Sequence, residues 1–325
     1  MGNNSEIILD VKDLKKYFPI RSGAQKGKYV KAIDGIDFFI RKGETLGLVG
    51  ESGSGKSTTA YSVIGMYSAT AGDMRFMGND ISMEAGKRPM HIKKEMGMVF
   101  QDPGTTLNPQ RTVKQILSLP LQVHKMCPKS DMTKVIGQLL RDVELPMEYL
   151  YKYPASLGGG ERQMLAIARA LATDPSMIVL DEPTSALDVS VQAKIINMLL
   201  RIQKERELAY LFITHDLSLM RNLATRVAIM YLGKISEIAA TDAFFKAPKH
   251  PYTQMLLSAI PVVSEDEEKL KPQKVVPQGE IPSPVDVPPG CSFASRCPFA
   301  TDKCREVDPE MKEIETDHWV RCHLV

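Results

Sequence analysis

The stretch that decides the fold is Gly50-Glu51-Ser52-Gly53-Ser54-Gly55-Lys56-Ser57. It follows the strand-like run Thr45–Val49 and precedes the helical pattern Thr58–Met66, which is the context that a phosphate-binding loop requires. Its glycines allow successive backbone N–H groups to converge on phosphate oxygens, and the following helix directs its positive end at them. We therefore expect Lys56 to reach the β- and γ-phosphates of a nucleotide, and the Ser57 hydroxyl to ligate Mg²⁺.

A second group of chemically active residues follows the apolar run Met177–Leu180, which predicts a buried strand. Two carboxylates, Asp181 and Glu182, come directly after it. The carboxyl ends of strands are where open α/β sheets bind their ligands. We expect Asp181 to hold Mg²⁺ through water, and Glu182 to orient or deprotonate the water that attacks the nucleotide.

Strand and helix patterns alternate along most of the chain, which predicts an α/β core with a largely parallel sheet. The stretch Val113–Leu150 lacks strand patterning, so we expect a helical subdomain inserted into this core. The other expected strands are Ile7–Leu14, Ala32–Ile40, Met96–Phe100 and Tyr210–Thr214, with two weaker ones after Tyr231, and the other expected helices are Glu161–Ala172, Val191–Glu205, Asp242–Phe245 and Pro251–Ala259.

The composition is that of an ordinary globular protein: of 325 residues, 43% are hydrophobic and 25% are charged. The net charge of +2 argues against a nucleic-acid partner bound through a broad basic face. No apolar run approaches the roughly 20 residues of a membrane-spanning helix. No secretory signal is evident, and Glu6 occupies the position where a myristoylation signal requires Ser or Thr. We expect a cytosolic chain that reaches the membrane through a partner.

The last part of the chain has a different composition. The acidic run Ser264–Lys269 and a series of prolines predict an extended linker without activity of its own. Four of the five cysteines follow, and only Cys127 stands apart. In a reducing compartment such clustering favours a metal or a metal cluster over disulfides. The four clustered residues are Cys291, Cys297, Cys304 and Cys322.

Further motifs complete an ordered series. Two of them lie between the phosphate loop and the carboxylate pair: Phe100-Gln101-Asp102 and Leu157-Gly158-Gly159-Gly160-Glu161. Two more follow the carboxylate pair: Ser185–Asp188 and Thr214-His215-Asp216. Over about residues 7–260 this series resembles the ATPase subunits of ABC transporters. The resemblance implies a P-loop NTPase (RecA-like) α/β core with an antiparallel β subdomain and an inserted helical subdomain at about 102–165. A small Cys-rich C-terminal extension, 261–325, would follow the ATP-binding domain 1–260.

The same resemblance assigns roles by position. Gln101 corresponds to the Q-loop residue that senses Mg²⁺, the nucleophile and the membrane partner, Asp188 to the D-loop, and His215 to the histidine that contacts the γ-phosphate. Tyr17 corresponds to the aromatic residue that stacks on adenine, but Phe18 is adjacent, and an ordinary half-buried strand tyrosine is the alternative. The expected ATP ligands are Tyr17, Gly50, Ser52, Gly53, Ser54, Gly55, Lys56, Ser57, Thr58 and Gln101; the catalytic residues are Glu182, His215 and Gln101; the Mg²⁺ ligands are Ser57, Gln101 and Asp181.

The signature loop departs from the family pattern Leu-Ser-Gly-Gly-Gln, because Gly158 replaces the serine and Glu161 replaces the glutamine. In the family this loop acts on the ATP of the other subunit in a head-to-tail dimer. Loss of the serine hydroxyl removes one hydrogen bond to a charged group, worth about 1.5–3 kcal/mol. We therefore expect a heterodimer with a paralogous ATPase and two unequal ATP sites. In the alternative, backbone N–H groups of residues 158–160 suffice and both sites hydrolyse ATP.

The stretch Lys249–Pro261, which contains His-Pro-Tyr-Thr, resembles the C-terminal extension of the oligopeptide/dipeptide importer ATPases. This resemblance implies two transmembrane permeases as partners, an extracellular substrate-binding protein that supplies the cargo, and a peripheral position at the cytoplasmic face of the membrane. Nickel or glutathione is the alternative cargo. A soluble ABC ATPase without a transport role, or a subunit that does not hydrolyse ATP, is the alternative function.

The four clustered cysteines match the end of that subfamily, in which some members carry a 4Fe–4S cluster on these thiolates. Pro298 follows Cys297 directly, as proline follows a cluster cysteine in bacterial ferredoxins. The absence of a Cys-x-x-Cys pair weakens the alternative of zinc. Zinc and free thiols both remain open at this point.

Overall fold

The computed structural model describes residues 6–260 and 275–325, and it divides the chain into two compact units. Unit 1 takes in the described residues of Met1–Ile7, together with Ile40–Glu44 and Ala85–Ile213. Unit 2 takes in Ile8–Phe39, Thr45–Glu84 and the described residues of Thr214–Val325. The predicted acidic linker Ser264–Lys269 lies outside the described residues.

A parallel sheet with the strand order β8-β7-β6 lies in unit 1. Its central strand, β7, and its neighbour β8 are buried along their whole length. Continuous apolar sequence suits strands that are covered on both faces, as parallel strands are. The predicted parallel core is thereby confirmed for this unit. The strands are β6 (Met96–Val99), β7 (Met177–Asp181) and β8 (Ala209–Thr214).

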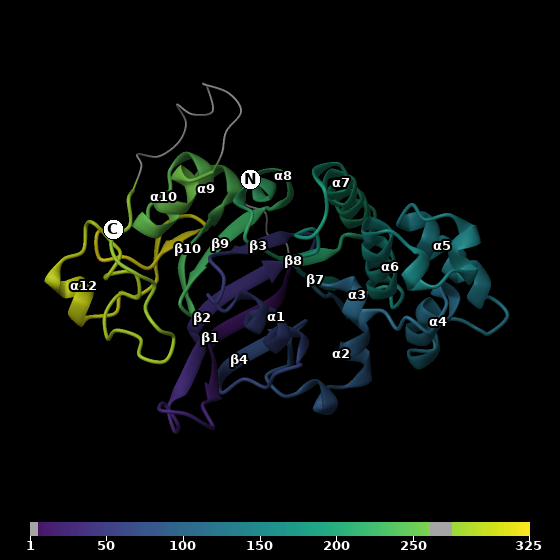
Figure 1. The fold of residues 1–325 in the computed structure, drawn as a ribbon, viewed down its shortest axis with the longest axis horizontal. Coiled ribbons are helices and arrows are strands. Elements are labelled where there is room, and N and C mark those ends of the chain that lie inside the picture. The colour runs from purple at the N-terminus through teal and green to yellow at the C-terminus, as the bar shows by residue number, and fades with distance from the viewer. Residues whose placement is uncertain (1–5, 261–274) are drawn as a thin grey trace. The chain divides into compact units, whose positions relative to one another are not determined.

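Helices make up the rest of unit 1, and α4, α5 and α6 contact one another (Figure 1). Thr112 caps the start of helix α4: its hydroxyl accepts the N–H of Gln115, while the Gln115 side chain accepts the N–H of Thr112. This reciprocal pair is a capping box. The helical character predicted for Val113–Leu150 is confirmed. The helices are α2 (Met90–Lys94), α3 (Pro103–Thr106), α4 (Val113–Val123), α5 (Met132–Asp142), α6 (Gly159–Leu171) and α7 (Val189–Arg206), with short 3-10 turns at Ala85–Lys87, Met147–Tyr151 and Pro154–Ser156.

Unit 2 contains two groups of strands. One is a four-stranded sheet with the order β2-β1-β4-β5, in which β1 and β5 both run antiparallel to β4. In the other, with the order β11-β12-β10-β9-β3, only β3 and β9 are parallel. The predicted antiparallel β structure is therefore present. The strands are β1 (Ile7–Pro19), β2 (Tyr29–Arg41), β3 (Thr45–Val49), β4 (Ala71–Phe76), β5 (Asn79–Asp80), β9 (Arg226–Tyr231), β10 (Lys234–Ala240), β11 (Lys312–Glu315) and β12 (His318–Val320).

The helices of unit 2 include the one that follows the phosphate loop, α1. Helix α10 begins at Pro251, as predicted, because proline has a helical φ and its missing N–H is not needed in the first turn. No helix within residues 6–260 and 275–325 has both the length and the apolar character required to cross a membrane. The helices are α1 (Lys56–Ile64), α8 (Leu217–Leu223), α9 (Thr241–Lys246), α10 (Pro251–Ser258) and α12 (Asp302–Glu306).

Candidate nucleotide-binding site

The phosphate loop lies in unit 2, between β3 and α1, and its glycines are required by close backbone packing. A Cβ atom on Gly50 would lie 2.1 Å from the carbonyl oxygen of Met230. At Gly55, where φ is +109°, it would lie 2.2 Å from the carbonyl oxygen of Ala32. Gly53 also has a positive φ, +77°, but open space around it. Only glycine fits the first two positions without a shift of the backbone.

The loop encloses the ammonium group of Lys56, which is buried at the start of α1. Its Nζ donates to the carbonyl oxygens of Gly50 at 2.8 Å and Glu51 at 2.9 Å. Ser57 and Thr58 lie half-buried in the same first turn, where helical N–H groups point outward. A cation held by two carbonyls beside a helix N-terminus can exchange those carbonyls for phosphate oxygens.

Tyr17 and Phe18 make different contacts on β1. The Tyr17 hydroxyl donates to Asp34, and burial, together with this hydrogen bond, raises the pKa of the phenol. The Phe18 ring packs edge-on against Tyr67, with 5.2 Å between the centroids. Tyr17 remains half-buried. Its predicted role in adenine stacking stays a prediction, since these contacts also suit an ordinary strand tyrosine.

His215 is exposed directly after β8, at a turn that is fixed by its neighbours. The Thr214 hydroxyl accepts the N–H of Asp216 at 3.0 Å, and the Asp216 carboxylate accepts the N–H of Ser218 at 2.9 Å as the cap of α8. The backbone on either side of the imidazole is thus held in place. This geometry presents the ring to solvent, where a ligand can reach it.

In unit 1 the structure brings two predicted catalytic residues together. The Gln101 side-chain amide donates to the Glu182 carboxylate at 3.0 Å. Asp181 is fully buried at the end of β7, while Glu182 is partly exposed beside it. Glu182 has a φ of +45°, and its N–H donates to the carbonyl of Ile213 at 2.9 Å. A positive φ at a residue with a side chain costs free energy and is typical of functional sites.

The signature loop, Leu157–Glu161, also lies in unit 1, where Gly158 and Gly159 are exposed at the start of α6. The Glu161 carboxylate accepts the N–H of Gly158 at 2.8 Å and the hydroxyl of Tyr149 at 2.6 Å. These two hydrogen bonds, the one from Tyr149 foremost, lower the pKa of Glu161. Glu161 therefore caps the helix. A glutamate three residues after a helix cap is a signal that the sequence analysis overlooked.

Asp188, the predicted D-loop residue, caps α7. Its carboxylate accepts the hydroxyl of Ser190 at 2.6 Å and the N–H of Val191 at 2.9 Å, and these bonds, led by that from Ser190, lower its pKa. Capping alone is sufficient to explain this geometry. The D-loop role stays a prediction.

The four clustered cysteines are free thiols in unit 2. Burial raises the pKa of Cys291 to about 11, and the charges of the other three contribute to the increase. The thiols are therefore electrostatic neighbours. Among the described residues, however, no three His, Cys, Asp or Glu side chains are arranged to hold a metal ion. The predicted ligand set for a cluster or for zinc receives no support from this arrangement. Cys127, in unit 1, is half-buried near Met132.

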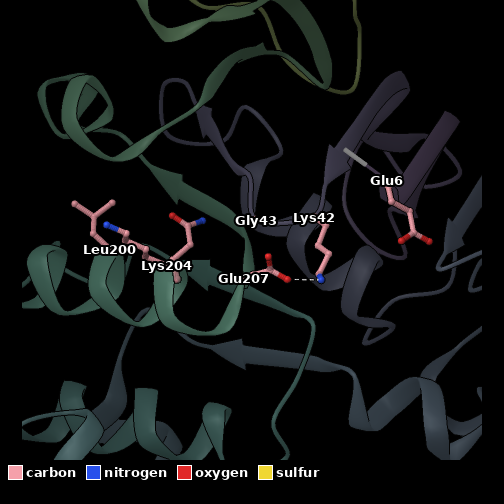
Figure 2. Close-up of a pocket in the computed structure, with 7 residues that line it drawn as sticks. Glu6, Lys42, Gly43, Leu200, Lys204 and Glu207 are labelled. Carbon is pink, nitrogen blue, oxygen red and sulfur yellow. Dashed lines mark hydrogen bonds and ion pairs between the residues drawn. The ribbon is translucent and has the colours of Figure 1, made fainter. Parts of the chain in front are cut away.

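A cavity of about 660 Å³ in unit 1 was not predicted from the sequence, and none of the predicted site residues lines it (Figure 2). Lys42 and Glu207 form an ion pair across it, and both side chains are at least half exposed. An exposed pair of this kind contributes little to stability. The cavity is lined by Glu6, Lys42, Gly43, Leu200, Gln203, Lys204 and Glu207.

Known proteins resemble this chain over nearly its whole length. Residues 33–185 match the family described as ABC transporter, and residues 236–304 match the oligopeptide/dipeptide transporter C-terminal region. The oligopeptide transport ATP-binding protein AppF of Bacillus subtilis is 46% identical over 99% of this chain and 98% of its own length. OppF of Salmonella typhimurium is 38% identical over 98% of this chain and 96% of its own. A solved dimer of the ATP-binding cassette MJ0796, bound to ADP and Pi after hydrolysis, matches with a TM-score of 0.64 and 26% identity, over 72% of this chain and 99% of that one.

These likenesses agree with the phosphate loop and with the paired Gln101 and Glu182 found in the structure. The chain belongs to the ATP-hydrolysing subunits of the ABC transporters, in the branch of the oligopeptide/dipeptide transporters.

Proposed function

We propose that this ATPase energises the import of oligopeptides or dipeptides. The observation that carries the proposal is the likeness, over nearly the whole length, to two oligopeptide transport ATP-binding proteins, combined with a complete phosphate loop. The chain would lie at the cytoplasmic face of the membrane, bound to two transmembrane permeases, and an extracellular binding protein would select the cargo. Nickel or glutathione is the alternative cargo.

Most of the proposed nucleotide ligands belong to unit 2, and Gln101 of unit 1 completes the proposed set. Lys56 neutralises the β- and γ-phosphates, the N–H groups of residues 50–58 bind their oxygens, and Tyr17 stacks on the adenine. Mg²⁺ would be held by Ser57, Asp181 and Gln101, whose hydroxyl, carboxylate and amide oxygens are the hard donors that this ion prefers. When bound, the ion neutralises charge on the phosphates.

Glu182 is the residue proposed to activate the water that attacks the γ-phosphate. Its carboxylate is partly exposed, it holds a defined position through the bond from Gln101, and the strained backbone beneath it is fixed by Ile213. A carboxylate in this state can orient the water and accept its proton. His215 would contact the γ-phosphate, and Gln101 would relate the state of the site to the permeases.

The organisation of the assembly follows from the signature loop. With glycine at position 158, the loop offers backbone N–H groups and no hydroxyl to the ATP of the partner. We propose a heterodimer with a paralogous ATPase, in which the site that receives this loop is the weaker one. We further propose that 1–260 is the ATP-binding domain, with its helical subdomain at about 102–165, and that 261–325 is the extension.

The test is phosphate release by the chain assembled with its permeases and paralogous ATPase in proteoliposomes. Peptide-loaded binding protein should stimulate hydrolysis, while nickel-loaded or glutathione-loaded protein should not. Glu182→Gln should lower the rate by at least about 100-fold and leave ATP binding intact. The exposed Glu84→Gln serves as the matched control. If hydrolysis survives Glu182→Gln, Glu182 is not the base. If a lone monomer hydrolyses ATP at the full rate, the ATP sites are not shared between two subunits.

We also propose an iron–sulfur cluster on the four clustered cysteines; the support for it is their number and their grouping within the C-terminal extension. As placed, the thiols do not form a ligand set, so loading would require their side chains to move. No step of ATP hydrolysis is assigned to the cluster. Anaerobic purification should give absorbance near 400 nm that Cys297→Ser removes. A colourless protein with bound zinc, or without metal, would exclude the cluster.

A further inference from the structure

The second residue of the phosphate loop, Glu51, is bound by the C-terminal part of the chain. Both oxygens of its carboxylate accept hydrogen bonds from the Arg296 guanidinium, at 2.9 and 3.3 Å. Its backbone N–H donates to the Tyr252 hydroxyl at 3.2 Å. All three residues belong to unit 2, and Arg296 directly precedes Cys297. The phosphate loop and the Cys-rich extension are therefore in direct contact.

Aromatic side chains fix the Arg296 side chain in this position. Its guanidinium lies 5.8 Å from the ring centroids of both Tyr231 and Phe293. The Tyr231, Tyr252 and Phe293 rings pack against one another, with centroids 4.6 to 5.4 Å apart. Only 9% of the Arg296 side chain is exposed, against 27% for Glu51. A planar guanidinium held in this way meets a carboxylate in fixed geometry.

The extension that carries Arg296 is itself built into the core of unit 2. Strand β12 pairs antiparallel with β10, so that Glu237 lies opposite Val320. The buried Glu237 carboxylate binds the His318 ring at 2.8 Å and accepts the N–H of His250 at 2.9 Å. Phe293 joins Arg296 to this framework, because its ring lies 6.0 Å from that of His250 and its carbonyl accepts the N–H of Arg296 at 2.9 Å. The extension can therefore act on the loop as a rigid support.

The chemistry explains why such a support is needed. Glu51 places a negative charge within a loop that has to receive the anionic phosphates of ATP. An uncompensated carboxylate there repels them, because like charges interact strongly where water is partly excluded. Arg296 neutralises this charge and holds the side chain in one orientation, while Tyr252 satisfies an N–H group of the loop.

We propose that Arg296 is a positioning residue for the phosphate loop, through which the Cys-rich extension sets the affinity of the site for ATP. The proposal deepens the assigned function and rests on it, since the loop must bind ATP. Arg296 acts through Glu51 and touches no reacting atom. Its removal should therefore raise the KM for ATP more than it lowers kcat.

The experiment is a double-mutant cycle on the full-length chain, with a fluorescent ATP analogue and Mg²⁺ as the probe. Arg296→Met should weaken binding about tenfold, and Arg296→Lys should restore part of the loss, since a charge returns without the bidentate geometry. In the Glu51→Gln background, Arg296→Met should change affinity less than about twofold. The matched control is Arg305→Met, because Arg305 is an exposed arginine of the same extension.

The outcomes distinguish a positioning role of Arg296, exerted through Glu51, from a purely structural role. An equal loss of affinity with and without the Glu51 carboxylate would show that Arg296 acts only as a structural residue, and would overturn the proposal. The same holds if Arg296→Lys, shown to be folded by thermal unfolding, binds as poorly as Arg296→Met. If the unaltered chain fails to bind the analogue, the assigned function fails instead, and that result differs from all of these.

Discussion

The phosphate loop and the signature loop both serve ATP in this family, but the chain supports them in opposite ways. Glu51 of the phosphate loop is held by Arg296, 245 residues away in the sequence, and by Tyr252. Glu161 of the signature loop is held by Gly158, three residues before it, and by Tyr149, twelve before it. The first loop depends on distant parts of the chain, and the second depends on its neighbours.

The same contrast applies to the glycines of the two loops. A Cβ atom on Gly55 would collide with the backbone of Ala32 at 2.2 Å. On Gly158 it would meet only Glu161, at 3.6 Å, which is an ordinary van der Waals distance. The contrast holds for these two positions and not for every glycine of the loops, since Gly53 also has open space and a Cβ on Gly160 would lie 2.4 Å from the Val191 side chain. Position 158 of the signature loop can therefore hold either glycine or the serine of the family pattern, whereas position 55 of the phosphate loop can hold only glycine.

The largest effect is expected from Gly55→Ala compared with Gly53→Ala. Both positions have positive φ, but only Gly55 lacks space for a methyl group. Strain and collision together should weaken ATP binding by about 100-fold or more at Gly55, whereas strain alone should cost about tenfold at Gly53. The measurement is the affinity for a fluorescent ATP analogue. Equal losses of affinity at the two positions would show that the close packing around Gly55 does not affect ATP binding.

The next effect concerns the remote support of the phosphate loop and its dependence on pH. His250 caps α10, and its Nδ1 accepts the N–H of Tyr252 at 3.0 Å. Burial lowers the pKa of His250 from 6.5 to about 4, although Glu237 opposes the change. The unfolded chain therefore binds this proton below about pH 6.5 and the folded chain only near pH 4. The stability that neutral His250 contributes should fall by about 2 kcal/mol between pH 7 and pH 5.

His250→Asn should remove this pH dependence, because asparagine can cap the helix and does not titrate. The measurement is urea unfolding followed by the fluorescence of Trp319, which is the single tryptophan of the chain and lies in β12. The matched control is His91→Asn, at an exposed histidine, which should leave the pH dependence of the free energy of unfolding unchanged. If the free energy of unfolding of His250→Asn depends on pH as it does in the unaltered chain, other groups cause that dependence.

The smallest effect is expected in the signature loop. Gly158→Ser restores the hydroxyl of the family pattern, and the structure has space for its Cβ. If the missing hydrogen bond makes the two ATP sites unequal, hydrolysis by the assembled transporter should rise about tenfold. Gly159→Ser, where a Cβ would contact only Leu187 at 3.5 Å, is the matched control. Equal rates for Gly158→Ser and the unaltered transporter would favour the alternative in which backbone N–H groups suffice.

Local signals in the sequence predicted much of this molecule. The apolar runs of β7 and β8, the proline at the start of α10 and the loop before α1 could all be predicted, because each is encoded within a few residues. Strands β4, β5, β9, β11 and β12 were not predicted. The apolar run Val227–Tyr231 of β9 carries the same signal as that of β7 and was overlooked. Strands β5, β11 and β12 are only two to four residues long, so their pairing depends on distant partners.

The candidate site divides in the same way. The sequence predicted Gln101 and Glu182 as catalytic residues, but only the structure shows the bond between them and the positive φ of Glu182. It predicted four neighbouring thiols, and the structure places them in one electrostatic environment without the geometry of a metal site. Distances between residues that are far apart along the chain depend on tertiary packing, which a local sequence pattern does not predict.

By itself, then, the sequence determined that this chain binds and hydrolyses ATP, because the chemistry of phosphate binding requires particular residue types at fixed spacing. Only the tertiary structure decided that Glu51 would meet Arg296, and that β12 of the extension would join β10 of the core. A short motif fixes its own backbone through steric limits and hydrogen bonds over a few residues. A contact across 245 residues depends instead on the packing of distant segments, here the aromatic cluster around Arg296 and the pairing of β12 with β10.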